Sequence, residues 1–297
     1  MRLGCLVATL VGATILALPA TALIDATLDE ARRYQAVVMV VAGASRRCTA
    51  TKIAPRRFLT AAHCVANTSQ GTVDQAFAPG SMIRVSNVLT PTGAADFVRL
   101  RVVQAHLPPE FTQALKRLHA YQQKIIRQYQ QSYTGAELER RTRHVESQNH
   151  VTSRVADLAI VEVQEHTAKI PLARIDFAPL TADEPVRLVG YGCERFDKRN
   201  GHSAPIPLSR RKWGETRVIR VDPVNFYTFA HRMRAGAPSL CPGDSGGPVM
   251  RAGQVVGVHG TVYGLARTHG ARSNMSVNLR VMQPWLDAHR GRTAASH

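Results

Sequence analysis

Acidic residues are scarce in this chain. Its 297 residues include 21 Asp and Glu against 38 Lys and Arg, which gives a formal net charge of +17. Such an excess of cations favours acidic partners such as polyanionic glycans, anionic lipid or nucleic acid, and it says nothing about the fold. Hydrophobic residues make up 44% of the chain and charged residues 20%, a balance that excludes a disordered protein.

Long apolar runs are also rare, and the only marked one lies at the N-terminus. Residues 3–18 are apolar, Met1-Arg2 supplies a positive start, and residues 19–22 form an A-x-A-like cleavage site. The run is short for a membrane span, so we interpret residues 1–22 as a signal peptide cleaved after Ala22. The chain is then secreted or periplasmic with no stable membrane anchor, and an uncleaved anchor is the alternative.

Cysteines are few as well. Cys5 leaves with the signal peptide, because a lipoprotein cysteine would stand at the end of the apolar run, and Cys48, Cys64, Cys193 and Cys241 remain. An even number in an exported protein predicts two disulfides, and four cysteines allow three pairings. A zinc site is the alternative, but no CxxC or HxxxH spacing supports it. We expect neither a metal nor a cofactor.

Internal repeats are absent, and short apolar segments rich in β-branched residues dominate instead. They predict strands at 36–42, 58–64, 81–90, 96–106, 157–163, 184–192, 216–222, 225–231, 253–260 and 275–281, the second of them running into a turn. Clusters of Gly, Pro and Asn separate these segments. Many short strands at such spacing predict an all-β sandwich or barrel.

Residues 108–150 break this pattern, because they are rich in good helix formers. Apolar residues recur there at three- and four-residue steps, namely Leu115, Leu118, Tyr121, Ile125 and Tyr129. We expect an amphipathic helix that Gly135 ends, a second short helix at 136–146, and a last helix at 283–289 before a polar tail.

Three short islands carry candidate chemistry. "TAAHC" contains His63, "DLAIVEV" contains Asp157, and the turn "CPGDSGGPVM" at 241–250 contains Ser245. Each alone has a plain structural explanation. Together they supply the base, the orienting carboxylate and the nucleophile that serine acyl transfer requires. The glycines around Ser245 predict a tight turn that exposes backbone N–H groups.

In this order, the three islands resemble the chymotrypsin/trypsin-like serine proteases, in particular a bacterial secreted type. "LTAAHC" and "GDSGGPV" are the specific motifs, and the resemblance covers most of residues 34–290 apart from the helical insertion. It implies an all-β fold of two six-stranded antiparallel β-barrels with a helical insertion and a C-terminal helix. The first barrel would span 23–170 with His63, Asp157 and the insertion at about 108–150. The second would span 171–297 with Ser245, the helix and the tail.

The resemblance also assigns roles to residues. Ser245 would be the nucleophile, His63 the general base and then acid, and Asp157 the group that fixes the histidine tautomer. The N–H groups of Gly243 and Ser245 would form the oxyanion hole. Asp244 would pair with a new N-terminal ammonium, which signal removal would place on Leu23 or Ile24; its alternative role is to cap the turn by hydrogen bonds.

The cysteines fit the same resemblance. Cys48 and Cys64 match the disulfide that flanks the catalytic histidine. Cys241 stands before the nucleophile turn, but its usual partner is absent between residues 261 and 275. Cys193 follows "GYG", which resembles a family segment near the oxyanion turn, so a Cys193–Cys241 bridge is implied.

Substrate specificity is also implied by the resemblance. Ser239 occupies the base of the primary pocket, where an aspartate would select Lys or Arg. The remaining pocket positions are His259, Gly260, Thr261, Val262 and Ser276. Gly260 and Thr261 would pair with the substrate backbone and Val262 would narrow the pocket, which favours a small or medium apolar side chain. His259 could instead hold an acidic side chain, or it could be a neutral histidine packed behind the wall.

The helical insertion separates His63 from Asp157 by more residues than is usual in the family. Its basic residues are Lys116, Arg117, Lys124, Arg127, Arg140, Arg141 and Arg143. They form either a solvated face, an exosite for an anionic surface, or a lid over the cleft. No nucleic-acid-binding motif is present, which argues against a nucleic-acid target.

The sequence therefore predicts a secreted serine endopeptidase that hydrolyses peptide bonds through His63, Asp157 and Ser245. The alternative is a catalytically silent homologue that binds anionic surfaces through the basic insertion. An esterase with the same triad is a third interpretation, and the trypsin-like motifs around His63 and Ser245, rather than a GxSxG elbow, count against it.

Overall fold

The computed structural model describes residues 23–43, 46–147, 151, 154–193, 195–199, 202–206, 210–231, 233–262 and 273–291. The predicted signal peptide and the end of the polar tail lie outside this part of the chain. No helix within it is long and apolar enough to span a membrane.

Six antiparallel strands close the first barrel in the order β2-β3-β4-β9-β8-β7. They are β2 (Val37–Ala42), β3 (Arg46–Ala54), β4 (Arg57–Thr60), β7 (Met82–Ser86), β8 (Val98–His106) and β9 (Ala159–Val163). The short pair β5 (Ala66–Asn67) and β6 (Thr72–Val73) and the 3₁₀ turns η1 (Gln75–Phe77) and η2 (Ala94–Asp96) connect them. The His63 segment is not a plain turn, because β4 ends at Thr60 and a one-turn helix, α1 (Ala62–Val65), follows.

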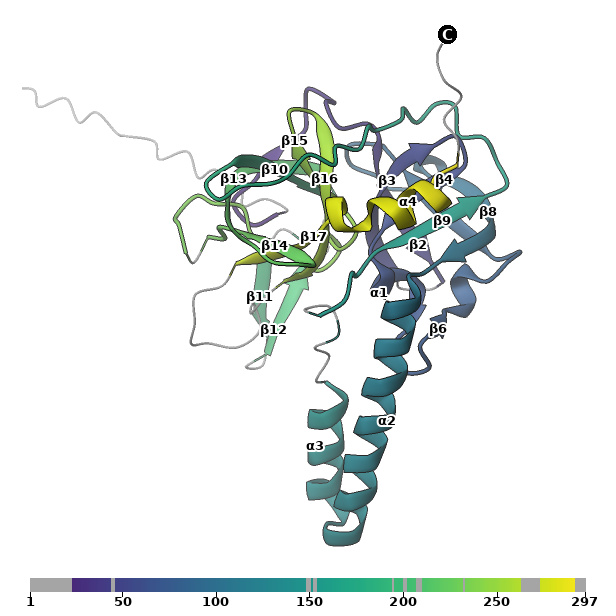
Figure 1. The fold of residues 1–297 in the computed structure, drawn as a ribbon, viewed down its shortest axis with the longest axis vertical. Helices are drawn as coiled ribbons and strands as arrows, with labels where there is room; N and C mark the ends of the chain where they lie inside the picture. The colour runs from purple at the N-terminus through teal and green to yellow at the C-terminus, as the bar shows by residue number, and fades with distance from the viewer. Residues whose placement is uncertain are drawn as a thin grey trace, which may run out of the picture.

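Six further strands close the second barrel in the order β13-β10-β15-β16-β17-β14, since β14 pairs back onto β13. They are β10 (Pro185–Gly190), β13 (Lys212–Val221), β14 (Asn225–Thr228), β15 (Pro248–Arg251), β16 (Gln254–Val262) and β17 (Asn274–Asn278). β1 (Thr27–Leu28) pairs with the first two residues of β13, Lys212 and Trp213. The pair β11 (Arg195–Arg199) and β12 (His202–Ile206) forms a separate hairpin that the sequence patterns did not predict. The predicted fold of two six-stranded barrels is confirmed (Figure 1).

β2 explains how the two barrels share a core. All six of its residues, "VVMVVA", are buried. Val38 and Val40 point into the first barrel, whereas Met39 and Val41 pack in the cluster between the barrels with Val258 and Leu279. Alternate side chains of a strand face opposite sides, so a continuous apolar run marks a strand buried on both faces.

The helical insertion is an antiparallel hairpin of α2 (Pro109–Ser132) and α3 (Gly135–Glu146), and it projects away from the barrels (Figure 1). Phe111 and Leu115 at its base are buried in the core of the first barrel. The predicted helical face was partly wrong: Tyr121 is 61% exposed, and the buried residue farther along is Ile126.

The last helix, α4 (Gln283–His289), follows the 3₁₀ turn η4 (Leu279–Met282) and has the bounds that the sequence predicts. Leu286 is buried in the cluster between the barrels. The Arg57 guanidinium on β4 donates to the His289 carbonyl at 2.7 Å, so the C-terminal segment of the second barrel is held against the first.

Candidate active site

The structure brings His63 and Asp157 into contact although 94 residues separate them. His63 lies on α1, and Asp157 stands two residues before β9 and is buried. His63 Nδ1 is 2.6 Å from Asp157 Oδ2, and the His63 backbone N–H donates to Asp157 Oδ1 at 2.8 Å. Two hydrogen bonds to one carboxylate fix both the position of the helix and the orientation of the imidazole.

This pairing determines the protonation of His63. Burial by itself lowers the pKa of the imidazole, but the charge of Asp157 and the hydrogen bond to it outweigh burial, and the pKa of His63 is raised above its ordinary value. A proton on Nδ1 directed at Asp157 leaves Nε2 as the basic nitrogen. The arrangement suits a general base whose protonated form is stabilised.

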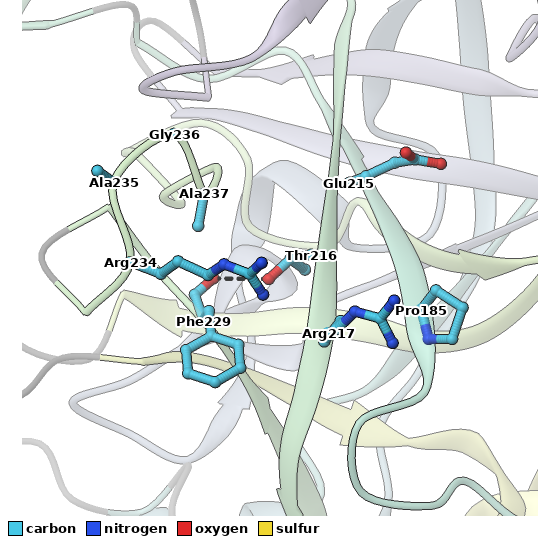
Figure 2. A pocket seen from close by; sticks show the side chains of 9 residues that line it. All are labelled: Pro185, Glu215, Thr216, Arg217, Phe229, Arg234, Ala235, Gly236 and Ala237. Carbon is cyan, nitrogen blue, oxygen red and sulfur yellow. Dashed lines mark hydrogen bonds between the residues drawn. The ribbon is translucent and has the colours of Figure 1, made fainter.

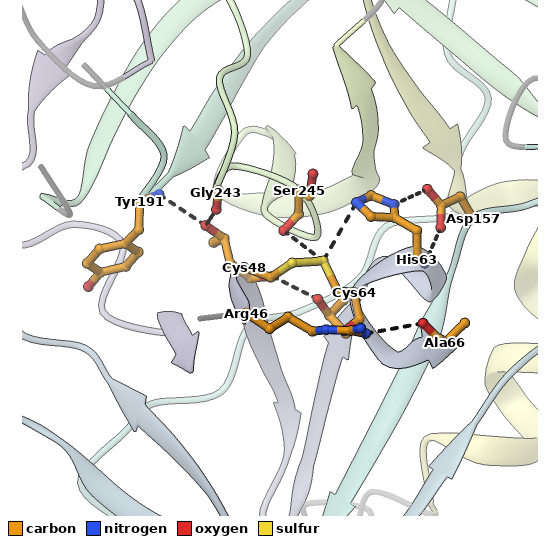
Figure 3. Close-up of a disulfide and its surroundings, with 11 residues drawn as sticks. Arg46, Cys48, His63, Cys64, Ala66, Asp157, Tyr191, Gly243 and Ser245 are labelled. Carbon is orange, nitrogen blue, oxygen red and sulfur yellow. Dashed lines mark hydrogen bonds and ion pairs between the residues drawn. A yellow bond between two sulfur atoms is a disulfide. The ribbon is translucent and has the colours of Figure 1, made fainter. Parts of the chain in front are cut away.

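Ser245 lies in the turn that precedes β15, beside this pair. In Figure 3 the His63 ring lies between Asp157 and Ser245. Among the residues described, no hydrogen bond joins the Ser245 hydroxyl to His63; Nε2 is the ring nitrogen that does not face Asp157. Nucleophile–base hydrogen bonds are often long when no substrate is present. The Ser245 carbonyl accepts a hydrogen bond from the Thr49 N–H at 2.9 Å, which holds the turn against β3.

Gly243 has the conformation that the turn requires. Its φ is +102°, and a Cβ there would lie 2.9 Å from the Cα of Gly192. The Cys193 N–H donates to the Pro242 carbonyl at 3.0 Å. In a trans peptide the N–H points opposite to the carbonyl, so the Gly243 N–H points away from Cys193. Among the residues that the structure describes, none accepts a hydrogen bond from the Gly243 N–H, which is therefore available to bind an anion.

Asp244 faces the protein interior rather than the substrate side. Its carboxylate accepts hydrogen bonds from the Gly192 N–H at 2.7 Å and the Cys241 N–H at 2.9 Å. Burial raises the pKa of Asp244 to about 7, although these hydrogen bonds and the charge of Lys212 lower it. The segment "GYG" provides the space, because a Cβ on Gly190 or Gly192 would overlap this carboxylate.

Both disulfides implied by the resemblance are present. Cys48–Cys64 joins β3 to α1 beside His63 (Figure 3), and Cys193–Cys241 joins the segment after β10 to the start of the nucleophile turn. Cys48, His63 and Cys64 also form the one group of potential metal ligands among the described residues. Both sulfurs are in the disulfide, so no thiolate is available to bind a metal there.

Two of the predicted pocket residues, His259 on β16 and Ser276 on β17, are paired across the strands, and the His259 N–H donates to the Gly247 carbonyl at 2.8 Å. The Ser239 hydroxyl accepts from the His231 N–H at 2.8 Å, and Ser276 Oγ lies 3.3 Å from His259 Nδ1. Burial lowers the pKa of His259 to about 3, and the nearby Val189 carbonyl offsets only part of this effect, so the ring is neutral. Gly260 and Thr261 continue β16 toward Asp157, and the Val262 side chain lies outside the described residues.

Asn274 is a buried residue next to the predicted pocket position Ser239 that the sequence did not reveal. Its Oδ1 accepts from the Leu240 N–H at 2.9 Å, and its amide donates to the Pro238 and Phe229 carbonyls at 2.9 Å each. It therefore ties β17 to the residues on either side of Ser239. No local signal marks it, because its partners are at least 34 residues distant.

A separate cavity of about 330 Å³ lies on the second barrel (Figure 2). Its lining residues are Pro185, Glu215, Thr216, Arg217, Phe229, Arg234, Ala235, Gly236 and Ala237. None of these is His63, Asp157 or Ser245, so this cavity is not the catalytic cleft.

Solved structures with similar folds include human heparin binding protein and a double mutant of it. The first has a TM-score of 0.56 and 14% identity, with 92% of this chain and 98% of that chain covered. The second has a TM-score of 0.56 and 15% identity, with 88% and 96% covered. At such identities the likeness concerns the fold alone. Comparison with curated protein sequences returns no match.

A family model described as Trypsin matches residues 112–286, more than half of the chain. The match includes Asp157 and Ser245, and it begins after His63. Together with the two closed barrels, it establishes that this chain belongs to the trypsin family.

Proposed function

We propose that this protein is an exported serine endopeptidase with Ser245 as nucleophile, His63 as general base and Asp157 as the orienting carboxylate. The observation that carries the proposal is the pair of hydrogen bonds from His63 to the buried Asp157, beside a serine in a turn where the Gly243 N–H has no hydrogen-bond partner among the described residues. An aspartate that only stabilises a turn would not need to direct its carboxylate at an imidazole between the two barrels.

In the proposed reaction the Ser245 oxygen attacks the scissile carbonyl carbon while its proton passes to His63 Nε2. The carbonyl electrons move onto oxygen, where the N–H groups of Gly243 and Ser245 bind the oxyanion. Collapse expels the amine, which takes the proton from His63, and leaves an acyl group on Ser245. Water then attacks with His63 again as base, which releases the acid and restores the hydroxyl.

For the side chain before the cleaved bond we propose a small apolar residue, with Glu or Asp as second choice. Position 239 is a serine, so it offers no negative charge to a Lys or Arg side chain of the substrate. The neighbouring Asn274 amide already forms hydrogen bonds with backbone groups. To hold a carboxylate by charge, the buried His259 would have to take up a proton, which its pKa of about 3 disfavours.

Purified protein that begins after residue 22 is expected to react with a fluorophosphonate probe, and Ser245→Ala is expected not to react. The probe requires an activated serine, and mass spectrometry locates the adduct. Enzyme from the same preparation that has not been exposed to the probe is then profiled on peptides with Ala, Val, Glu or Lys before the cleaved bond, where preference for Glu would favour the second choice. A folded wild type that does not react with the probe would contradict the proposed activity.

A second candidate function is binding of a polyanion, and one feature of α2 favours it. Lys116, Arg117, Lys124 and Arg127 are exposed and fall within about 100° of the helix circumference, along about 16 Å. Among the described residues no carboxylate pairs with them, whereas Glu137 binds Arg140 and Arg141, and Glu139 binds Arg143. If the fluorophosphonate probe does not label the protein, retention on a heparin column tests this function. A variant with the four α2 residues changed to Gln should lose retention, whereas a variant with Arg140 and Arg141 changed to Gln should keep it.

In the proposed enzyme, removal of the signal peptide is itself the activating step. Ile24 pairs with Ser239 through two backbone hydrogen bonds of 3.0 and 2.9 Å. Leu23 is fully buried in the cluster that contains Leu240, close in sequence to Asp244. This placement supports a Leu23 ammonium as the counter-ion of Asp244.

Protein that begins at Leu23 is expected to keep its stability toward neutral pH better than protein with two extra N-terminal residues. Without the ammonium, Asp244 has a folded pKa of about 7, above its value in the unfolded chain. The folded state then binds more protons, so stability falls as pH rises from the ordinary aspartate range to about 7. The ammonium lowers that pKa and reduces the fall.

The measurement is the melting temperature of both forms between pH 4 and pH 8, with Asp244→Asn as the control that removes the titration. N-terminal sequencing of active secreted enzyme gives an independent check. Active enzyme that starts well away from Leu23 and Ile24 would rule out this mode of activation.

A further inference from the structure

Thr49 on β3 is a fully buried residue of the first barrel whose hydroxyl forms hydrogen bonds with the second barrel. Its Oγ1 donates to the Gly243 carbonyl at 2.8 Å and accepts from the Tyr191 N–H at 3.0 Å. These are the dashed lines that reach Gly243 and Tyr191 in Figure 3. A hydroxyl has one proton to donate, and here Gly243 receives it.

The Thr49 backbone makes a second contact with the same turn. Its N–H donates to the Ser245 carbonyl at 2.9 Å. Thr49 thus donates to the carbonyls of both Gly243 and Ser245, the two residues proposed to supply the oxyanion donors. Its own carbonyl accepts from the Thr60 hydroxyl at 2.8 Å, which fixes Thr49 to β4 just before His63.

Among the described residues, the hydrogen bonds that hold Pro242 and the Asp244 side chain come from the second barrel, whereas the Ser245 carbonyl also lies 3.7 Å from Cys64 Sγ of the first barrel. The Pro242 carbonyl is held by the Cys193 N–H, and the Asp244 carboxylate by Gly192 and Cys241. Thr49, unlike these N–H donors, belongs to the barrel that carries His63 and Asp157. The Thr49 hydroxyl therefore sets where the turn stands relative to the catalytic base.

We propose that Thr49 is a positioning residue for the oxyanion turn: its hydroxyl, shared between Tyr191 and Gly243, holds the Gly243 N–H at the place where the oxyanion forms. The inference rests on the proposed protease function. It goes beyond that function in assigning a side chain outside the triad to transition-state binding. The alternative is that Thr49 only stabilises the contact between the barrels.

Thr49→Val keeps the size of the side chain and removes the hydroxyl. We expect kcat for a peptide substrate to fall about 10- to 100-fold with KM within about threefold, because an oxyanion donor contributes mainly in the transition state. Affinity for a peptide aldehyde, whose adduct carries the oxyanion, should fall by a similar factor. Affinity for the matching product peptide should not change. Thr49→Ser, which restores the hydroxyl, should recover most of the activity.

Thr51 provides the matched control. It lies two residues along β3, is also fully buried, and its hydroxyl has no partner among the described residues. Thr51→Val should leave kcat and aldehyde affinity unchanged. If Thr49→Val does not fold, Thr49→Ala takes its place in the same measurements, with Thr49→Ser as the rescue.

The outcomes separate the two proposals. A wild type that neither hydrolyses peptides nor binds the aldehyde would overturn the protease function and this inference with it. An active wild type whose Thr49→Val variant melts earlier but keeps kcat and aldehyde affinity would overturn this inference alone. Equal losses in Thr49→Val and Thr51→Val would do the same.

Discussion

Asp157→Asn is expected to lower kcat by about 10⁴-fold, the size established for this exchange in the Ser-His-Asp triad as a class. Asp157 accepts two hydrogen bonds, from the ring Nδ1 and the backbone N–H of His63. Asparagine has only one oxygen. If that oxygen keeps the backbone bond, the amide faces Nδ1 and forces the ring proton onto Nε2, which then cannot accept a proton from Ser245.

The pH dependence distinguishes this effect from a loss of folding. In the wild type, kcat/KM should rise with pH through the raised pKa of His63, because only the neutral ring acts as base. In Asp157→Asn the causes that raise this pKa are gone, so the midpoint should move to lower pH while the plateau falls. Asp183→Asn, at an exposed carboxylate, is the control. A plateau within tenfold of wild type would contradict the assigned role of Asp157.

Arg211→Met is expected to lower the free energy of unfolding by about 3–5 kcal/mol, because it leaves a buried carboxylate without its cation. The Arg211 side chain is 1% exposed and that of Asp29 is fully buried, with 2.8 Å between Nε and Oδ2. Arg211 also donates to the Asn87 carbonyl at 2.7 Å and to the Tyr191 hydroxyl at 3.1 Å. One side chain thus joins the N-terminal segment, the first barrel and the segment that reaches the oxyanion turn.

Urea unfolding of the wild type, Arg211→Met and Arg217→Met measures this loss in the free energy of unfolding. Arg217→Met is the matched control, because Arg217 is 42% exposed and its pair with Asp183 is worth less than about 1 kcal/mol. The double variant Asp29→Asn/Arg211→Met should recover part of the loss, since it also removes the buried charge. Similar unfolding midpoints for Arg211→Met and Arg217→Met would show that the buried pair is not essential.

Much of the fold follows from local pattern. Strands such as β2, β8 and β10 contain enough β-branched residues to be predicted. Two motifs indicate the family and contain His63 and Ser245, and the segment "DLAIVEV" supplies Asp157. The β11–β12 hairpin was missed because "RFDKR" and "HSAPI" lack an apolar alternation. Ile126 rather than Ile125 is buried on α2, one turn after Gln122, whose amide donates to the Val145 carbonyl of α3; packing between two helices decides which face of each is covered.

The positioning residues of the site could not be predicted, because their partners are remote in sequence. The Thr49 hydroxyl bonds to groups 142 and 194 residues away, and nothing in "RRCTATKIA" distinguishes it from the unpartnered Thr51. In the sequence, nothing distinguishes Asn274 from any other polar residue at the start of a strand. Its function depends on three backbone groups that only the closed second barrel brings together.

The double burial of β2 has a consequence for how the molecule loses its structure. Val38 and Val40 belong to the interior of the first barrel and Met39 and Val41 to the wall between the barrels, so neither core can open without exposing part of the other. The two halves therefore unfold as one cooperative unit. Because His63 and Ser245 come from different halves, we expect the proposed activity to be lost in a single step on unfolding, with no half-molecule that keeps a reactive serine.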